Sequence, residues 1–108
     1  MRPYEIVMIF DADLDDEAIR ASVDRSVEHI RNGGGEPGTV DHWGKRRFAY
    51  EMKHRWEGYY VVLSAKAEPT TVEELDRSLS LSDDVLRHRV VRLPDNTHRR
   101  TAETSAEA

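Results

Sequence analysis

The residues with the clearest potential for chemistry form the run Trp43-Gly-Lys-Arg-Arg-Phe-Ala-Tyr50, in which three consecutive cations are flanked by aromatic side chains. Guanidinium groups pair with phosphates and stack on bases, and aromatic rings stack on unpaired bases. The composition of this run therefore suits an RNA surface. A partly exposed strand with arginines on its solvated face would have the same composition, so the pattern leaves both interpretations open.

Alternation of side chains along a strand predicts how this run is divided between two faces. Arg46, Phe48 and Tyr50 should point one way, with Trp43, Lys45, Arg47 and Ala49 on the other side. Gly44 indicates a bulge or a close approach of another backbone, which would shift this assignment by one residue.

The charges are unevenly distributed along the chain. The net charge is -5, which opposes binding to phosphates. However, residues 11–17 hold five acids and no base, whereas residues 45–55 hold five bases against Glu51 alone. Arg87, Arg89 and Arg92 form a second basic group. Because the local field decides what a surface attracts, we expect a basic sheet and an acidic helical side.

Several classes of function are disfavoured by the composition. The chain has no cysteine, so disulfides, thiolate metal sites and cysteine nucleophiles are excluded. The five histidines have no ligand-like spacing on one helix, and the serines near residue 80 suit turns better than catalysis. No apolar run is long enough for a membrane helix, and no signal segment is evident. We expect a cytoplasmic protein without membrane contact, cofactor, metal or small-molecule substrate.

The apolar periodicity predicts six elements that position these residues. Strands are expected at 4–10, 39–51, 59–65 and 85–93, and helices from Asp13 or Asp15 to about Arg31 and from about Pro69 to residues 80–84. Thr70 with Glu73, or Thr71 with Glu74, would form a capping box. Residues 52–58 should turn the chain, and Val85, Val91 and Leu93 should face away from Leu86 and Val90.

The order strand, helix, strand, strand, helix, strand predicts an α+β fold of the ferredoxin-like split βαβ type. In this fold both helices cover one face of a four-stranded antiparallel sheet, with the first and third strands in the centre. We expect one domain over residues 1–94, followed by a polar, disordered tail over 95–108. An enzyme of this fold would need a positioned nucleophile that is missing here, whereas a homodimerisation module without RNA binding is a further alternative.

Four segments of the chain resemble the bacterial small-subunit ribosomal protein six family: Arg2-Pro-Tyr-Glu5, Trp43-Gly-Lys-Arg-Arg-Phe-Ala-Tyr50, Glu57-Gly-Tyr-Tyr60 and Leu86-Arg-His-Arg-Val90. The similarity extends from Met1 to about Leu93. It implies a structural, non-enzymatic constituent of the small ribosomal subunit. Such a protein would bind the central domain, or platform, of the small-subunit ribosomal RNA as a heterodimer with small-subunit ribosomal protein eighteen.

The resemblance also implies which residues would make these contacts. Positions that match the family pattern nominate Arg2, Tyr4, Lys45, Arg46 and Arg47 for RNA, and local charge alone adds Lys53, Arg55, Arg87 and Arg89. The open sheet face and the tail would meet the partner protein, which nominates Trp43, Tyr50, Tyr60, His98, Arg99 and Arg100. For Tyr60 a role in the core is the alternative, and for Trp43 the alternative is RNA contact.

Overall fold

The computed structural model describes residues 1–94, apart from the side chain of Met52. The predicted tail over 95–108, with His98, Arg99 and Arg100, lies outside the described residues. The order of elements is the predicted one. The elements are β1 (Arg2–Asp11), α1 (Asp16–Asn32), β2 (Glu36–Met52), β3 (Arg55–Ala67), α2 (Pro69–Leu81) and β4 (Val85–Arg92).

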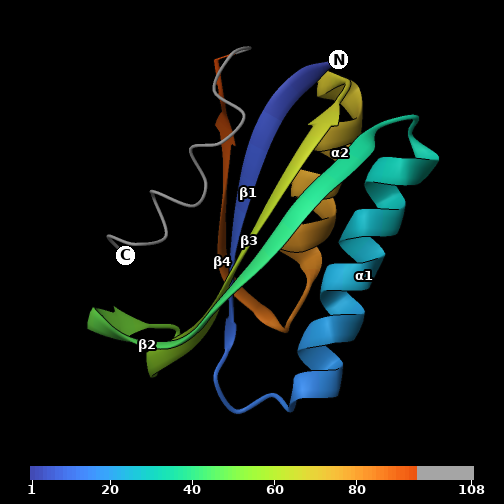
Figure 1. The fold of residues 1–108 in the computed structure, drawn as a ribbon. Coiled ribbons are helices and arrows are strands. Elements are labelled where there is room, and N and C mark those ends of the chain that lie inside the picture. Colours follow the sequence, from blue (N-terminus) through green and yellow to red (C-terminus); the bar gives the residue numbers. More distant parts are fainter. Residues whose placement is uncertain (95–108) are drawn as a thin grey trace.

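The four strands form one antiparallel sheet in the order β2-β3-β1-β4. The central position of β1 and β3 confirms the prediction from crossover handedness. Both helices cover the same face of the sheet, and the other face is free of helices (Figure 1). We call that second surface the open face.

The core lies between the sheet and the helices. Alternate residues of β1, from Tyr4 to Phe10, are buried against the apolar stripes of α1 and α2, which include Ile19 and Leu75. The predicted stripes account for this layer because each helix presents one apolar face to the sheet. No helix among residues 1–94 has the length and hydropathy that crossing a membrane requires.

The predicted N-cap chemistry is correct for α1 and wrong for α2. α1 follows Asp15, whose carboxylate accepts a hydrogen bond from the Ala18 N–H at 2.8 Å, so the second of the two proposed caps is correct. For α2 the capping boxes were wrong, because Glu68 is the N-cap and makes no side-chain cap bond. Instead, Pro69 supplies the first turn with a preset φ angle. Thr71 is a helical residue of α2 and its side chain is buried, so it does not serve as the N-cap.

Bulges change the predicted faces of two strands. A register shift between His42 and Gly44, with Gly44 at a φ of 88°, returns Trp43 to the face of Arg46, so its predicted placement opposite Arg46 was wrong. A second shift opposite Ile9 and Phe10 makes Leu86 the extra residue, so that Leu86 packs with Ile9 on the open face although its neighbour Arg87 lies opposite Ile9 on that face as well. Such shifts insert an extra residue into the alternation.

The same shift corrects the predicted faces of β4. Val90 lies opposite Ile6 and packs toward the core, whereas Val91 lies opposite Glu5 on the open face. Val85 and Val90 therefore share the core side, and the predicted grouping of Val85 with Val91 was wrong. The inserted residue reverses the alternation once, so both ends of the strand can bury an apolar side chain.

The hairpin that joins β2 to β3 is longer and tighter than predicted. After a register shift beyond Arg47, pairing resumes at Met52 and Arg55, so most of residues 52–58 belong to strands rather than to a turn. Lys53 and His54 alone make the connection, with φ values of 49° and 65°. Positive φ at both central residues is the signature of a type I′ turn, whose twist matches that of the strands.

Candidate nucleic-acid interface

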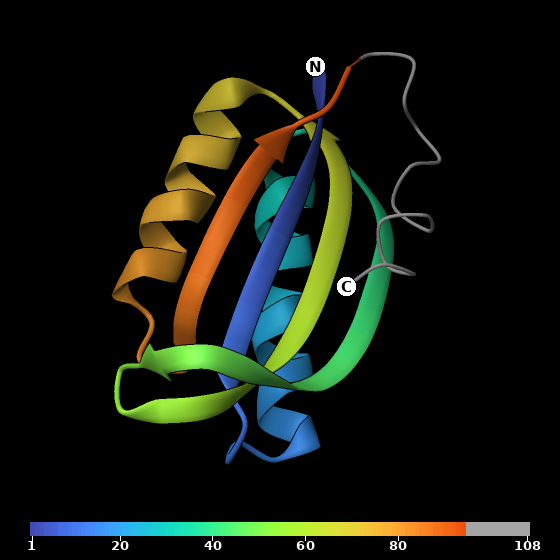
Figure 2. The ribbon, with the colours of Figure 1, turned by 90° about the vertical axis from the view of Figure 1, so that its left-hand side faces the viewer.

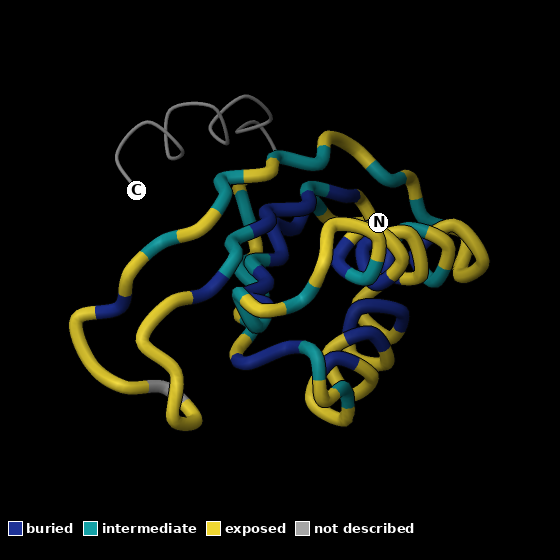
Figure 3. The backbone as a smooth tube through the Cα atoms, turned by 90° about the horizontal axis from the view of Figure 1, so that it is seen from below, coloured by how far each residue is buried: buried dark blue, intermediate teal, exposed yellow. Residues whose placement is uncertain are grey.

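The distal part of the β2–β3 hairpin, residues 46–58, forms an arm that reaches across one end of the open face toward β4 (Figure 2). Among the arm residues whose burial is described, only Phe48 and Gly58 are buried, and Figure 3 shows the arm extending from the body of the molecule. Phe48 is 6% exposed and packs with Ile9 and Leu86. A Cβ at Gly58 would lie 2.6 Å from both Ile9 and Phe48, so only glycine permits this approach.

An aromatic stack lies where the arm leaves the sheet. The rings of Trp43 and Tyr60 are nearly parallel, at 5°, with centroids 6.1 Å apart. The guanidinium of Arg46 lies 6.0 Å from the centre of the Trp43 ring. Burial raises the pKa of Tyr60, and neighbouring Tyr50 raises it further. This arrangement places a cation and a flat apolar surface side by side, as base stacking requires.

The arm also joins the basic residues of β4. The guanidinium of Arg87 donates a hydrogen bond to the Tyr50 hydroxyl at 2.9 Å, although these residues belong to the two outer strands of the sheet. Arg89 lies opposite Val7, on the open face together with Arg87. Arg87 and Arg89 are exposed, so the open face carries cations from both outer strands.

The basic triplet is divided between the two faces of β2. Arg46 lies over Trp43 on the open face, whereas Lys45 and Arg47 lie opposite Tyr59 and Glu57 of the neighbouring strand, on the other side. Lys45 and Arg47 are exposed. Because β2 is an outer strand, a ligand along its free edge can reach all three cations.

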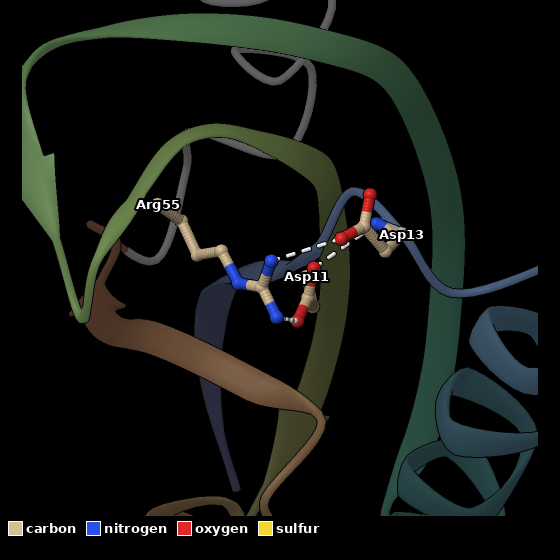
Figure 4. A network of polar contacts seen from close by, with 3 residues as sticks. All are labelled: Asp11, Asp13 and Arg55. Atoms are coloured by element: carbon tan, nitrogen blue, oxygen red, sulfur yellow. Dashed lines mark hydrogen bonds and ion pairs between the residues drawn. The ribbon is translucent and has the colours of Figure 1, made fainter.

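Arg55 differs from the other cations because two carboxylates bind it. One guanidinium nitrogen lies 3.1 Å from Asp11 and the other 2.9 Å from Asp13, as Figure 4 shows. These acids end β1 and begin the loop before α1, so the acidic run meets the basic arm. The predicted separation into a basic sheet and an acidic helical side is thus incomplete.

Arg2 and Tyr4 lie at the opposite end of the sheet from the arm. Arg2 is opposite Ala67, nine residues along β3 from Gly58, which is opposite Arg46. Arg2 is exposed, but Tyr4 is 8% exposed and belongs to the core. The structure therefore groups Lys45, Arg46, Arg47, Lys53 and Arg87 toward one end, places Arg89 near the middle of the sheet, and leaves Arg2 apart.

Sequence reasoning missed Asp11 and Asp13 as neighbours of the basic arm. The available signal was the opposite sign of runs 11–17 and 45–55, but only the pairing of β1 with β3 brings the two together. A cleft of about 380 Å³ beside this contact is lined by Arg47, Arg55, Asp11 and Asp13, with Trp56 and other arm residues.

Comparison with known proteins identifies the family. Residues 3–92 match the family model described as ribosomal protein S6. The chain is 50% identical over 92 residues to small ribosomal subunit protein bS6 of Mycolicibacterium paratuberculosis, a match that covers 85% of this chain and 96% of the relative. The chain belongs to the ribosomal protein S6 family. The resemblance noted from the sequence is confirmed.

Other S6-family proteins extend this comparison. The Carboxydothermus hydrogenoformans protein of the same name is 49% identical, again with 85% of this chain and 96% of the relative covered. The crystal structure of 30S ribosomal protein S6 from Thermotoga maritima superposes with a TM-score of 0.81 at 25% identity, covering 99% of this chain and 98% of that one. Membership of the S6 family makes this a structural, non-enzymatic protein of the small ribosomal subunit.

The fold itself is shared more widely than the S6 family. The C-terminal domain of MgtC from Mycobacterium tuberculosis superposes with a TM-score of 0.56 at 15% identity, over 89% of this chain and 90% of that one. Such a likeness concerns the fold alone, since one fold can carry unrelated functions.

Proposed function

We propose that this S6-family protein binds the central domain of small-subunit ribosomal RNA as a heterodimer with small-subunit ribosomal protein eighteen, in the cytoplasm. Lys45, Arg47 and Lys53 carry the main evidence for RNA. They are exposed along the outer strand and its turn, and no carboxylate among residues 1–94 forms an ion pair with them. Such cations are free to neutralise phosphates.

The remaining cations have different surroundings and therefore different proposed roles. Arg46 lies over Trp43, so it can contact a phosphate while supporting the ring. Arg87 and Arg89 extend the basic surface across the open face, and Arg2 would meet a separate part of the RNA. Tyr4 is omitted because its side chain is in the core, and Arg55 because two carboxylates already bind it.

The open face provides the proposed surface for the partner protein. Tyr50 is 55% exposed, and Trp43 and Tyr60 are half-buried beside it. Aromatic side chains of this kind suit a protein interface because they bury large areas and keep a polar edge. The net charge of -5 favours a basic partner, which would supply much of the phosphate neutralisation. His98, Arg99 and Arg100 remain proposed partner contacts in the tail.

A salt titration tests the RNA surface. Replacing Lys45, Arg46 and Arg47 by alanine should reduce the salt slope of RNA binding by about one per residue, because each removes one phosphate contact. Alanine at exposed Arg20, Arg25 and Arg77 removes the same charge from the helices and provides the control. An unchanged slope for the strand variant, in a protein that folds normally, would refute the assignment.

A further inference from the structure

The structure assigns Arg55, Asp11 and Asp13 to a tether that holds the arm in the position required for RNA binding. All three are positioning residues, and none needs to touch RNA. This inference rests on the proposed function, since it explains how the basic arm is oriented for that ligand. It gives Arg55 a different role from the one that its charge alone predicts.

The geometry of the contact is that of a two-point attachment. The two terminal nitrogens of Arg55 engage separate carboxylates, at 3.1 Å for Asp11 and 2.9 Å for Asp13. The carboxylate of Asp11 also accepts a hydrogen bond from the Asp13 N–H at 3.0 Å. That bond fixes the two acids relative to each other, so the planar guanidinium meets a preformed acceptor pair.

The arm has few other attachments to the body of the molecule. Phe48 packs on Ile9 and Leu86, and the Tyr50 hydroxyl accepts from Arg87. Other ion pairs made by described arm residues stay within the arm, as between His54 and Glu51. Arg55 therefore supplies the ionic link on the side of the arm that faces the β1–α1 loop (Figure 4).

The tether acts close to the basic triplet. Arg47 lines the same cleft as Arg55, Asp11 and Asp13, and it lies opposite Glu57 on the adjacent strand. If the contact is lost, the arm can move away from the β1–α1 loop and take Arg47 with it. The cations would then meet the RNA phosphates only after the arm is ordered again, which costs affinity.

The tether and simple electrostatics predict effects of opposite sign on RNA affinity when Asp13 is neutralised. Asp13→Asn removes a negative charge beside the basic arm and frees part of Arg55, so attraction to phosphates alone would strengthen RNA binding. Loss of the tether instead weakens binding. Asp13 suits this test because its side chain is 77% exposed, so the substitution should leave the core intact.

Two measurements on the full chain test the tether. Hydrogen exchange of the arm amides reports its attachment without RNA, and titration with a central-domain ribosomal RNA fragment, in the presence of protein eighteen, reports affinity and salt slope. Arg55→Ala removes both ion pairs, so it should accelerate exchange in the arm and weaken binding about threefold to tenfold, the range expected for two partly exposed ion pairs. Asp13→Asn leaves the pair with Asp11, so it should change both quantities in the same direction by a smaller amount. The salt slope should stay unchanged for Arg55→Ala, because Arg55 binds no phosphate.

Matched variants separate this effect from general changes in charge. Asp24→Asn and Arg77→Ala alter exposed residues of α1 and α2 and should leave arm exchange unchanged. Arg55→Lys, which keeps the charge but loses the two-nitrogen geometry, should give an intermediate loss. Tighter binding by Asp13→Asn, or unchanged arm exchange in both tether variants, would overturn the assignment. A salt slope lower by about one for Arg55→Ala would make Arg55 a phosphate contact instead. Failure of the proposed function would appear separately, in the Lys45, Arg46 and Arg47 variant.

Discussion

Replacing Phe48 by alanine should destabilise the protein substantially, although this residue belongs to an arm that is otherwise exposed. Phe48 is 6% exposed and packs with Ile9, Leu86 and Tyr60 in a small cluster on the open face. Phenylalanine-to-alanine changes at buried sites cost about 3–5 kcal/mol. Because this cluster is smaller than the main core and the arm can relax, we expect the lower limit, about 3 kcal/mol.

Urea unfolding monitored by circular dichroism would measure this loss. With a denaturant slope of about 1.5 kcal/mol per molar, typical of a small domain, the midpoint should fall by about 2 M. Trp56→Ala is the matched control, since Trp56 is an aromatic residue of the arm that is 51% exposed. This variant should lose less than about 1 kcal/mol of unfolding free energy. Equal, small losses for both variants would contradict the packing of the arm on the open face.

Local contacts supply three further tests. Lys53→Asn with His54→Gly should stabilise the protein by about 1 kcal/mol and so raise its thermal midpoint, because both positions have positive φ, which asparagine and glycine tolerate. A lower thermal midpoint would contradict the turn assignment. Asp15→Ala should cost about 1 kcal/mol in urea unfolding by removing the bond to the Ala18 N–H, and no change would exclude that cap. Since burial raises the pKa of Tyr60, its stabilising contribution is complete below the unfolded pKa of about 10 and is lost as the pH rises through the higher folded value. Tyrosinate absorbance should therefore show a late-titrating group that Tyr60→Phe removes, and an unchanged titration would contradict it.

The order of elements could be predicted because each has its own periodic signal. Ile19, Val23, Val27 and Ile30 repeat at helical spacing, and residues 4–10 of β1 are apolar except for Glu5 because this strand is central in the sheet. Once the order was known, handedness restricted the topology to the one observed. Asp15 could be proposed as a cap of α1 because a capping hydrogen bond joins residues that are close in the sequence.

The failures arose where one local interaction competed with another or with distant packing. Thr70 and Thr71 have capping-box partners in the sequence, but Pro69 starts the helix before them. Lys53-His54 lacks the Asn-Gly signal of a type I′ turn, so the strands were predicted too short. Gly44 signalled a bulge without showing its direction, and only the stack on Tyr60 decides where Trp43 points.

The candidate site was the least accessible part from sequence because its contacts join distant residues. Arg55 and Asp13 are 42 positions apart, and Tyr50 and Arg87 are 37 apart. Charge counting assigned Arg55 and Lys53 the same role, since both are cations of one hairpin. Their surroundings separate them, because only Arg55 is bound by carboxylates of another element.

We propose that this S6-family protein presents its basic residues to ribosomal RNA together with a second protein. The most direct measurement is a binding titration with a central-domain ribosomal RNA fragment, with and without small-subunit ribosomal protein eighteen. Tight binding only in the presence of both proteins, with a salt slope that the Lys45, Arg46 and Arg47 alanine variant reduces, is the predicted result. Absence of RNA binding in both conditions, together with a stable homodimer through the open face, would contradict the proposed function.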